Sequence, residues 1–381
     1  MPDYLHPGVY IEETELGPRP IEGVPTSTAA FLGEAERGST RPRLVTSYRD
    51  YQRWFGDVFA DGMFLPDAVR GFFENGGKRA FICRIVGDGA QPGADDYEGL
   101  PLTGRPAPQG LAALELDPCR EVALVYAPNV ATAIVRRIVE HCETQRFRFA
   151  VVDAPKGQVD PAELSPRNQI KDTEYAAFYY PWIVTSDPKT GARKLVPPGG
   201  HMLGVYARVD TERGVHKSPA NEVLRGVLDL EYDINQTMQD DLNPKGVNVI
   251  RRFPGRGIRV WGARTLSSSS LWKYVSVRRL FIFLERSIYE GTQWVIFEPN
   301  DDRLWARVAD RIRLFLRGLW CNGALLGRKE QEAFFVTCDG TTMTQDDILN
   351  GRLICVIGVA PVRPAEFVVF RIFQHTAEAE R

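Results

Sequence analysis

The stretch that decides the fold is EVALVYAPNVATAIVRRIVEHCETQRFRFAVVDAP, residues 121–155. It opens with the apolar run EVALVYAP, which is typical of a strand that is buried on both faces. The segment VATAIVRRIVEHCETQ then places its apolar residues at helical spacing, so we expect an amphipathic helix over residues 130–145. RFAVVDAP returns to the pattern of a buried strand. Strand, helix and strand at these lengths predict a βαβ unit, and therefore an α/β fold with parallel strands.

The chain before this unit also alternates strands and helices. TAAFLGEA (28–35) and RAFICRIV (79–86) indicate strands, and RLVTSYRDYQRWFG (43–56) indicates a strand that runs into a helix. FLPDAVRGFFENGG (64–77) predicts a helix that ends at glycine. Residues 87–110 are rich in Gly, Pro and Asp and indicate a linker or loop.

The chain after the βαβ unit gives a more mixed pattern. EYAAFYYPWIVTSD (174–187) indicates a further strand, and TGARKLVPPGGHMLGVYARVD (190–210) combines a turn, a Pro-Gly loop and an apolar run. RRLFIFLERSIYEG (278–291) fits a strand or a helix, and QWVIFEP (293–299) indicates a strand. Two more strands are expected around Phe334–Cys338 and Leu353–Val359.

Both ends of the chain read as arms. The first 25 residues contain five prolines, which break helices and discourage central strands, around a possible short strand in GVYIEE (8–13). Such an arm cannot bury its own apolar residues, so it needs a neighbour. At the other end, Phe367–Phe373 is a strong strand signal with apolar residues on both faces. An unpaired strand there would invite aggregation, so we expect its own domain or another copy to cover it.

One predicted helix, NDDRLWARVADRIRLFLRGLW (300–320), gathers arginines on one side. At about 100° per residue, its apolar residues form one broad side. Asn300 is the candidate N-cap, and Gly323 the candidate stop. The polar side is either a solvated surface or a docking strip for an acidic partner, since the guanidinium fork matches carboxylates. It carries Arg303, Arg307, Arg311, Arg313 and Arg317.

Composition excludes several classes of protein. The chain has 381 residues, 44% of them hydrophobic, and 47 Lys and Arg against 49 Asp and Glu. A balanced charge gives no reason to expect binding to nucleic acid or to an anionic membrane. No apolar run approaches the roughly 20 residues that a membrane span needs, and the first residues lack the features of a secretion signal. The six cysteines form no CxxC, and we expect mostly buried, reduced thiols.

A search for chemistry finds no positive signal. Gly255 and Gly257 in RRFPGRGIRVWGART do not make a dinucleotide or phosphate loop and instead predict a tight turn. The five histidines show no metal-ligand spacing, and no GxSxG elbow is present. A hydrolase would have to use residues such as Ser165 or His141, which lie in no recognisable motif. We therefore expect no catalytic residue, no cofactor and no metal.

Several further stretches resemble one family when they are taken in order. They are YYPWI (179–183), VPPGGHMLGVYARVD (196–210), GVHKSPAN (214–221), LNPKGVNVIRRFPGRGIRVWGARTL (242–266), YVSVRRLFIFLERSI (274–288), FEPND (297–301) and APVRPAEFVVF (360–370). In this order and spacing the chain resembles the tail sheath protein of contractile phage tails and of related bacterial contractile injection systems. The resemblance covers nearly the whole chain and is densest from about residue 175 onward.

This resemblance implies a mixed α/β, multidomain fold with extended terminal arms. The middle domain would be subtilisin-like in shape but not catalytic, and the C-terminal α+β domain would face an inner tube. The implied division is an N-terminal arm (1–24), an N-terminal α/β part with its linker (25–110), the subtilisin-like domain (111–265), the inner sheath domain (266–365) and a C-terminal strand or arm (366–381). Flexible linkers are expected at Gly17–Pro25 and Ala360–Pro364.

The implied function is that of a structural subunit, made in the bacterial cytoplasm, of a phage tail or a phage tail-like particle. Many copies would polymerise helically around an inner tube and contract to drive the tube through a target envelope. Expected partners are the tube protein, baseplate and tail-terminator or cap proteins, and sister sheath subunits, with no nucleic acid and no membrane insertion. The arginines of residues 303–317 become candidates for tube contact, with a sheath–sheath salt bridge or plain solvation as alternatives. The candidates for strands shared between subunits are Val9, Tyr10, Ile11, Phe367, Val368, Val369, Phe370 and Ile372.

Two other readings remain open at this point. A tube or baseplate protein of the same machine would have a different length and assembly, since tube subunits are typically shorter and form stacked rings. A hydrolase that uses the middle domain is the second alternative. The sequence does not separate a phage from an injection system or a pyocin.

Overall fold

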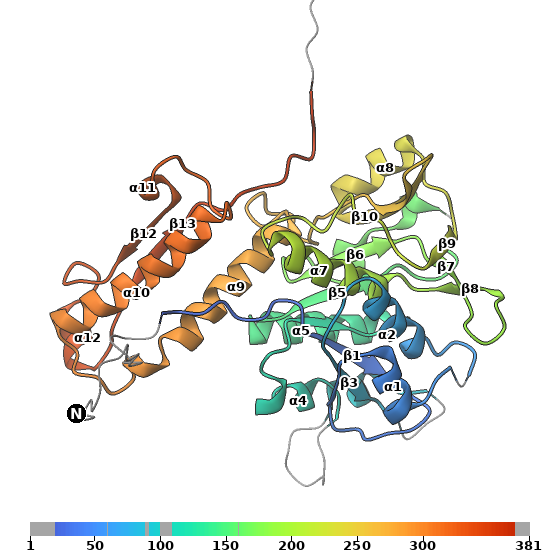
Figure 1. Ribbon diagram of the computed structural model, residues 1–381, viewed down its shortest axis with the longest axis horizontal. Coiled ribbons are helices and arrows are strands. Elements are labelled where there is room, and N and C mark those ends of the chain that lie inside the picture. The colour runs from blue at the N-terminus through green and yellow to red at the C-terminus, as the bar shows by residue number, and fades with distance from the viewer. Residues whose placement is uncertain (1–19, 59, 88–90, 100–108, 159, 370–381) are drawn as a thin grey trace, which may run out of the picture.

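A computed structural model describes residues 20–58, 60–87, 91–99, 109–158 and 160–369. Its main body is built on one eight-stranded sheet with the order β11-β10-β6-β5-β4-β1-β3-β2 (Figure 1). The six central strands are parallel, and the edge strands β11 and β2 are antiparallel to their neighbours. The strands are β1 (Ala29–Gly33), β2 (Arg43–Val45), β3 (Ala80–Arg84), β4 (Leu124–Tyr126), β5 (Phe149–Asp153), β6 (Ala176–Tyr180), β10 (Val247–Phe253) and β11 (Gly257–Val260).

The predicted α/β fold with parallel strands is confirmed. The βαβ unit consists of β4, α5 and β5, with β4 and β5 paired in parallel. Strand β1 pairs with β3 on one side and with β4 on the other. The expected N-terminal α/β part and the expected middle domain therefore share one sheet.

Helices cover both faces of this sheet, as the alternation of side chains requires. Ala29 and Phe31 point into one core, together with α1, α2 and α7, while Ala30 and Leu32 point into a second core with α3, α4, α5 and α8. The helices are α1 (Tyr48–Phe55), α2 (Leu65–Glu74), α3 (Ala94–Glu98), α4 (Gly110–Leu114), α5 (Thr132–Gln145), α6 (Pro166–Gln169), α7 (Gly199–Arg213) and α8 (Gln236–Leu242). The segment expected to be a linker or loop, residues 87–110, contains the short helix α3 in its described part.

Glycines allow α2 and α7 to pack at close range. A Cβ atom added at Gly200 would lie 2.3 Å from the carbonyl oxygen of Ala68, and one added at Gly204 would lie 2.5 Å from that of Phe72. Real Cβ atoms do not come that close to backbone, so only glycine fits at these two positions. The Pro-Gly segment that we expected to be a loop is the first turn of α7.

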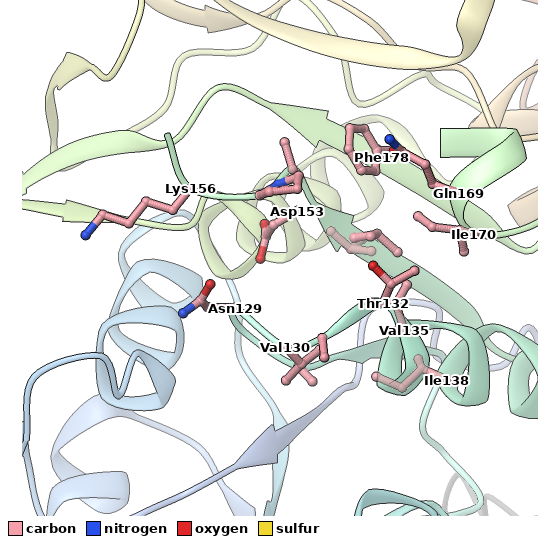
Figure 2. Close-up of a pocket in the computed structure, with 16 residues that line it drawn as sticks. Asn129, Val130, Thr132, Val135, Ile138, Asp153, Lys156, Gln169, Ile170 and Phe178 are labelled. Atoms are coloured by element: carbon pink, nitrogen blue, oxygen red, sulfur yellow. The ribbon is translucent and has the colours of Figure 1, made fainter. Parts of the chain in front are cut away.

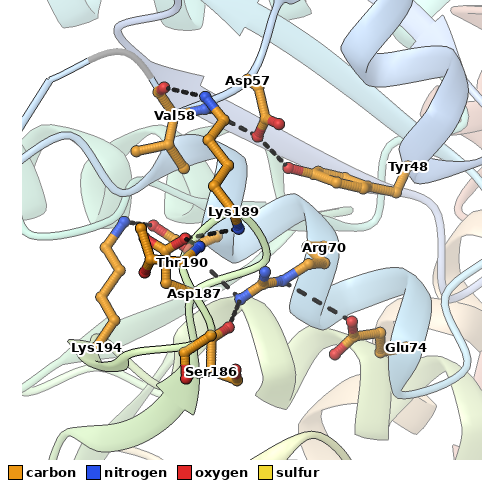
Figure 3. A network of polar contacts seen from close by, with 12 residues as sticks. Tyr48, Asp57, Val58, Arg70, Glu74, Ser186, Asp187, Lys189, Thr190 and Lys194 are labelled. Atoms are coloured by element: carbon orange, nitrogen blue, oxygen red, sulfur yellow. Dashed lines mark hydrogen bonds and ion pairs between the residues drawn. The ribbon is translucent and has the colours of Figure 1, made fainter.

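A small antiparallel sheet, β8-β7-β9, makes polar contacts with α2 and with the segment that precedes it (Figure 3). The Lys194 ammonium lies 2.6 Å from the carboxylate of Asp67, whose side chain is buried. Arg70 donates to the Ser186 carbonyl at 3.1 Å, and Lys189 donates to the Val58 carbonyl at 3.0 Å. These contacts fix the hairpin to the body. The strands are β7 (Ile183–Ser186), β8 (Arg193–Val196) and β9 (Val227–Leu230).

The C-terminal part has a third core of its own, beside the main body in Figure 1. It contains α9 (Val275–Gly291), α10 (Asp302–Cys321), α11 (Glu330–Ala333), α12 (Gln345–Leu349) and the antiparallel pair β12 (Phe334–Thr337) and β13 (Val356–Val359). The two strands expected here are confirmed, and RRLFIFLERSIYEG is helical. The strand expected in QWVIFEP is wrong. Only a 3-10 turn, Gln293–Val295, forms there, and Ile296 and Phe297 are exposed rather than paired.

Helix α9 joins the two parts through buried contacts. Arg279 lies 2.5 Å from Asp210 of α7, and both side chains are almost fully buried. The same guanidinium donates to the carbonyl of Thr26, and the Thr26 hydroxyl donates to Asp210 at 2.6 Å. Val24 donates its N–H to the Ser287 hydroxyl at 3.1 Å, and Ile21 is also buried. The segment from Ile21 is therefore held on α9 and is not the free linker that we expected at Gly17–Pro25.

Candidate assembly surfaces

Helix α10 presents the arginines as the sequence predicts, with one correction at its start. The N-cap is Asp301, which accepts from the Leu304 N–H at 2.8 Å, and not Asn300. Asn300 instead accepts from the Trp305 indole at 2.7 Å. Asp301 fits better because its side chain reaches the free N–H groups of the first turn while Asn300 holds Trp305 in the core. The other side of the helix buries Leu304, Trp305, Val308, Ala309, Ile312 and Leu316.

Two of the five arginines lie on the flanks of α10, where they are half-buried against the rest of the chain. The Arg311 guanidinium lies over the Trp294 ring, 3.9 Å from its centroid. Arg313 pairs with Asp310 at 3.0 Å and donates to the Val336 carbonyl of β12 at 2.9 Å. These two side chains fasten the helix to its neighbours, so they are weaker candidates for an outside partner.

The other three arginines form an outward ridge with two residues that the sequence analysis missed. Arg307 pairs with Glu298 at 3.1 Å, and Arg317 makes a two-pronged contact with Glu330 at 2.8 and 3.0 Å. Within the described residues, Arg303 makes no hydrogen bond or ion pair, and it is exposed.

The two missed residues are Leu314 and Gly318. Leu314 is 57% exposed. Among the described residues, a Cβ added at Gly318 would meet no atom within 4 Å beyond the adjacent residues and backbone of its own helix. A helical wheel places both among the outward arginines, which is the signal that would have identified them. We call Arg303, Arg307, Leu314, Arg317 and Gly318 the α10 ridge.

The candidates for shared strands fall partly outside the described residues. Val9, Tyr10, Ile11, Phe370 and Ile372 all lie outside them. Phe367, Val368 and Val369 are described, form no strand, and are 72%, 69% and 78% exposed. Three adjacent apolar side chains in solvent are a surface that another chain segment can cover.

The residue just before them is firmly held. The Glu366 carboxylate accepts from Arg264 at 2.7 Å through each oxygen, from Asn243 at 3.0 Å and from the Tyr274 hydroxyl at 3.1 Å, and Lys273 lies 3.3 Å away. Burial acts to raise the pKa of Glu366, but the hydrogen bonds from Arg264 and Asn243 lower it to about 2. Glu366 thus anchors the start of the C-terminal arm to the main body, and residues 367–369 lead away from the body (Figure 1).

The sheet of β12 and β13 is small and open at its edges. Among the described strands, these two pair only with each other. Phe335 and Val356 are 55% and 44% exposed. An isolated pair of strands is marginal in water, so this sheet is suited to receive further strands.

The main body has a cavity of about 310 Å³ at the carboxyl ends of β4 and β5 (Figure 2). Sheets of this kind often bind ligands at this edge. Here the carboxylate of Asp153 accepts from the Tyr126 hydroxyl at 2.5 Å and from the Gly199 N–H at 2.8 Å, and burial raises its pKa to about 7. Lys156 extends away from Asp153 in Figure 2. The Asp153 carboxylate is thus used in holding β5 to β4 and to the start of α7.

The residues that a hydrolase would need are not brought together. His141 lies on α5 against Arg148, and burial lowers its pKa to about 3. Ser165 precedes α6, and in the described part of the chain no hydrogen bond joins it to His141. Gly255 and Gly257 have φ of 69° and 76° in the turn between β10 and β11, which confirms the tight turn.

The described residues contain no disulfide and no cluster of side chains arranged to bind a metal ion. All six cysteines are free, and four of them, Cys83, Cys119, Cys142 and Cys338, are buried. No group of three or more His, Cys, Asp or Glu side chains is arranged for a metal within the described ranges. None of the described helices is long and apolar enough to cross a membrane.

Solved structures of contractile machines match this fold over nearly its whole length. The sheath of an extracellular contractile injection system, PVC, in its contracted state is 33% identical with a TM-score of 0.81, and the match covers 98% of this chain and 99% of that one. The contracted helical sheath of the anti-feeding prophage is 34% identical with a TM-score of 0.78, covering 97% and 99%.

Curated phage proteins match more distantly. A putative prophage major tail sheath protein of Pseudomonas aeruginosa is 27% identical over 59% of this chain and 57% of its own. The tail sheath protein of Vibrio phage KVP40 is 25% identical over 85% of this chain and 52% of its own. The chain thus spans about half the length of these curated relatives.

Two family descriptions divide most of the chain between them. The phage tail sheath protein central domain matches residues 91–266, and the phage tail sheath C-terminal domain matches residues 267–375. Together with the full-length likeness to the two sheath structures, these matches show that the chain belongs to the phage tail sheath protein family.

Proposed function

We propose that this chain is the repeating subunit of a contractile sheath that polymerises helically around an inner tube and shortens to drive that tube through a target envelope. The observation that carries the proposal is the near-complete match, at about one-third identity, to sheath subunits in contracted assemblies. A subunit whose surface meets a different surface on the next copy produces an open helical polymer. Related chains come from a baseplate structure as well, which supports a baseplate partner. Cap proteins and sister sheath subunits belong to the same proposal.

Strand exchange would connect the copies. The β12–β13 sheet offers open edges, and the apolar residues after Glu366 need cover. In this proposal, the segment around Phe367–Ile372 of one copy, and the segment around Val9–Ile11 of another, add strands to the sheet of a third. Main-chain hydrogen bonds give such contacts strength, while the alternating side chains give them register. Glu366 would keep the arm attached to its own body while the bodies move.

The α10 ridge would face the tube. Its exposed arginines suit an acidic tube surface, because charged contacts at a wet interface are easier to undo than apolar burial. Ion pairs of the ridge with Glu298 and Glu330 would be exchanged for ion pairs with the tube. The subunit would act without catalysis or cofactor, since the residues that a hydrolase would need lie apart.

Truncation after Glu366 tests the role of the arm. Removing residues 367–381 leaves the three cores and the Glu366 anchor untouched. The truncated chain should fold with an unchanged circular dichroism spectrum and melting temperature, but form no long sleeves in negative-stain images. A matched control replaces residues 367–381 with a Gly/Ser segment of equal length. Normal sleeves from either variant would rule out strand exchange through this arm, and stacked narrow rings from the wild-type chain would favour the tube alternative.

Charge reversal tests the ridge. Arg303→Glu removes a cation that has no partner in the described chain, whereas the control Arg313→Glu removes one that binds β12. If the ridge meets an acidic tube, Arg303→Glu should leave monomer stability within about 1 kcal/mol and weaken assembly around the tube. Arg313→Glu should instead lower monomer stability. An Arg303→Glu sheath that still assembles extended around its tube would contradict the tube contact.

A further inference from the structure

Cys338 and Cys355 lie opposite each other at one end of the small C-terminal sheet. In the antiparallel pair of β12 and β13, Thr337 is opposite Val356. The same register, continued by one residue, places Cys338 opposite Cys355. Both side chains belong to the third core, where Cys338 is buried and Cys355 is half-buried.

The two thiols are close enough to interact. Burial raises the pKa of both thiols, and each thiol also acts on the pKa of the other. Residues that face each other in an antiparallel pair have Cα atoms roughly 4.5–5.5 Å apart, which falls inside the range of about 4.4–6.8 Å found across disulfides. The loop between them is already held closed nearby, since the Thr342 hydroxyl donates to the Ile354 carbonyl at 2.8 Å.

We propose that Cys338 and Cys355 are a modification site at which a small-molecule disulfide oxidises the pair to an intrachain disulfide. In the reduced chain the two thiols pack as small apolar groups. In an oxidising medium the bond closes the end of the β12–β13 sheet that lies away from α11. The other end is already closed, because Ala360 donates to the Ala333 carbonyl and accepts from the Leu326 N–H.

The reaction is two thiol–disulfide exchanges with a disulfide of the glutathione type. Cys355, the more accessible thiol, attacks the small disulfide as a thiolate, forms a mixed disulfide and releases one small thiol. The Cys338 sulfur then attacks the Cys355 sulfur and releases the second small thiol. Both protons end on the released thiols, and the two electrons reduce the small disulfide. Burial raises the pKa of Cys355 to about 12, so the first step is slow at neutral pH and faster in mild alkali.

A metal does not explain the pair as well as a disulfide does. Zinc sites use four ligands, commonly Cys and His. In the described part of the chain, no third ligand of the kind that binds metals joins these two thiols. The remaining cysteine of this region, Cys321, is exposed on α10 and serves as an internal control.

Peptide mapping of the full-length chain tests the bond. The reduced protein is incubated with oxidised glutathione at mildly alkaline pH, free thiols are alkylated, and trypsin is added without reductant. Cleavage after Arg352 separates the two cysteines, so only a disulfide keeps their peptides together. We expect this linked pair from the wild-type chain and from Cys321→Ser, and its absence from Cys355→Ser.

The melting temperature of the chain provides a second test of the disulfide. A bond that closes a loop limits the unfolded chain, so the oxidised wild-type protein should melt several degrees higher than the reduced protein, with no such rise for Cys355→Ser. Free Cys338 and Cys355 after oxidation, or links of either one to Cys321, would overturn the proposal. A linked pair without a rise in melting temperature would overturn its role in closing the sheet. The idea that a closed sheet helps to receive strands from neighbouring copies rests on the proposed function. Peptide mapping and the melting temperature both use the isolated chain. Their results therefore test the disulfide whether or not the chain forms sleeves.

Discussion

Gly318 offers the sharpest test of the α10 ridge. It lies inside a helix, where glycine costs about 0.5–1 kcal/mol relative to alanine. Elsewhere in the fold such a cost has a packing reason, as at Gly200 and Gly204. At Gly318, outside the adjacent residues and backbone of α10 itself, no atom of the described residues lies within 4 Å of an added Cβ, and the backbone is ordinary helix. If the α10 ridge meets a partner, as we propose, a glycine at this position would let that partner approach the helix closely.

Two substitutions separate the subunit from its assembly. Gly318→Ala should raise the free energy of unfolding by about 0.5–1 kcal/mol, because it restores helix propensity without a clash. Gly318→Leu should change the stability of the monomer by less, but it fills the space beside Leu314 and should impair assembly around the tube. Urea unfolding of the monomer and negative-stain counts of tube-filled sleeves measure the two effects. Ala133→Leu places the same leucine side chain at an exposed position of α5 and serves as the control.

Each of the two substitutions has an outcome that would refute this reasoning. If Gly318→Ala destabilises the monomer, the position is not free within the subunit. If Gly318→Leu assembles around the tube as well as Ala133→Leu does, no partner approaches the ridge at this point. Gly318 would then carry a cost in helix propensity for which the structure gives no reason.

Three further predictions concern single residues. Glu366→Gln should speed hydrogen exchange in residues 360–366 roughly 10–100-fold at neutral pH. In the wild-type chain the same segment should loosen as pH falls from about 4.5 toward about 2, because a carboxylate whose pKa is lowered on folding stabilises only while it is ionised; a segment unchanged over that range would contradict the anchor. Gly204→Ala should lower the free energy of unfolding by about 1–3 kcal/mol in urea titrations, since its methyl group would meet the Phe72 carbonyl. Gly255→Val should cost about 1 kcal/mol or more through backbone strain alone, and Gly255→Asn less, because Asn tolerates positive φ better.

Local patterns were enough to predict the central layers of the fold. Strands β1, β3, β4 and β5 are short apolar runs between polar turns, and α5 repeats its apolar residues at helical spacing. These signals depend on neighbours in sequence, so they survive without knowledge of the partners. The wrong strand at QWVIFEP shows the limit, because an apolar run forms a strand only when a sheet edge lies beside it. There Trp294 is covered by Arg307 and Arg311, and the residues after it face solvent.

The candidate site was predictable as a helix face but not in its details. Spacing alone placed five arginines on one side of α10. It could not tell that Arg311 would meet Trp294, or that Arg313 would meet β12, because both contacts join elements distant in sequence. The contacts of Glu366 could not be predicted for the same reason. Its partners are distant from it in the sequence: Asn243, Arg264 and Lys273.

The strengths of these contacts suggest how one subunit can move without coming apart. Breaking a buried pair such as Arg279–Asp210 by removing one partner costs about 3–5 kcal/mol, whereas an exposed pair such as Arg307–Glu298 contributes about 0–1 kcal/mol. The contacts that join α9 to the main body are of the first kind, and those along the α10 ridge are of the second. A change that separates a ridge from its partner therefore need not disturb the connection between the two parts of the subunit. In the proposed sheath, main-chain pairing at β12 and β13 would involve neither kind of side-chain contact. Strands from neighbouring copies would therefore stay in place while the α10 ridge separates from its partner.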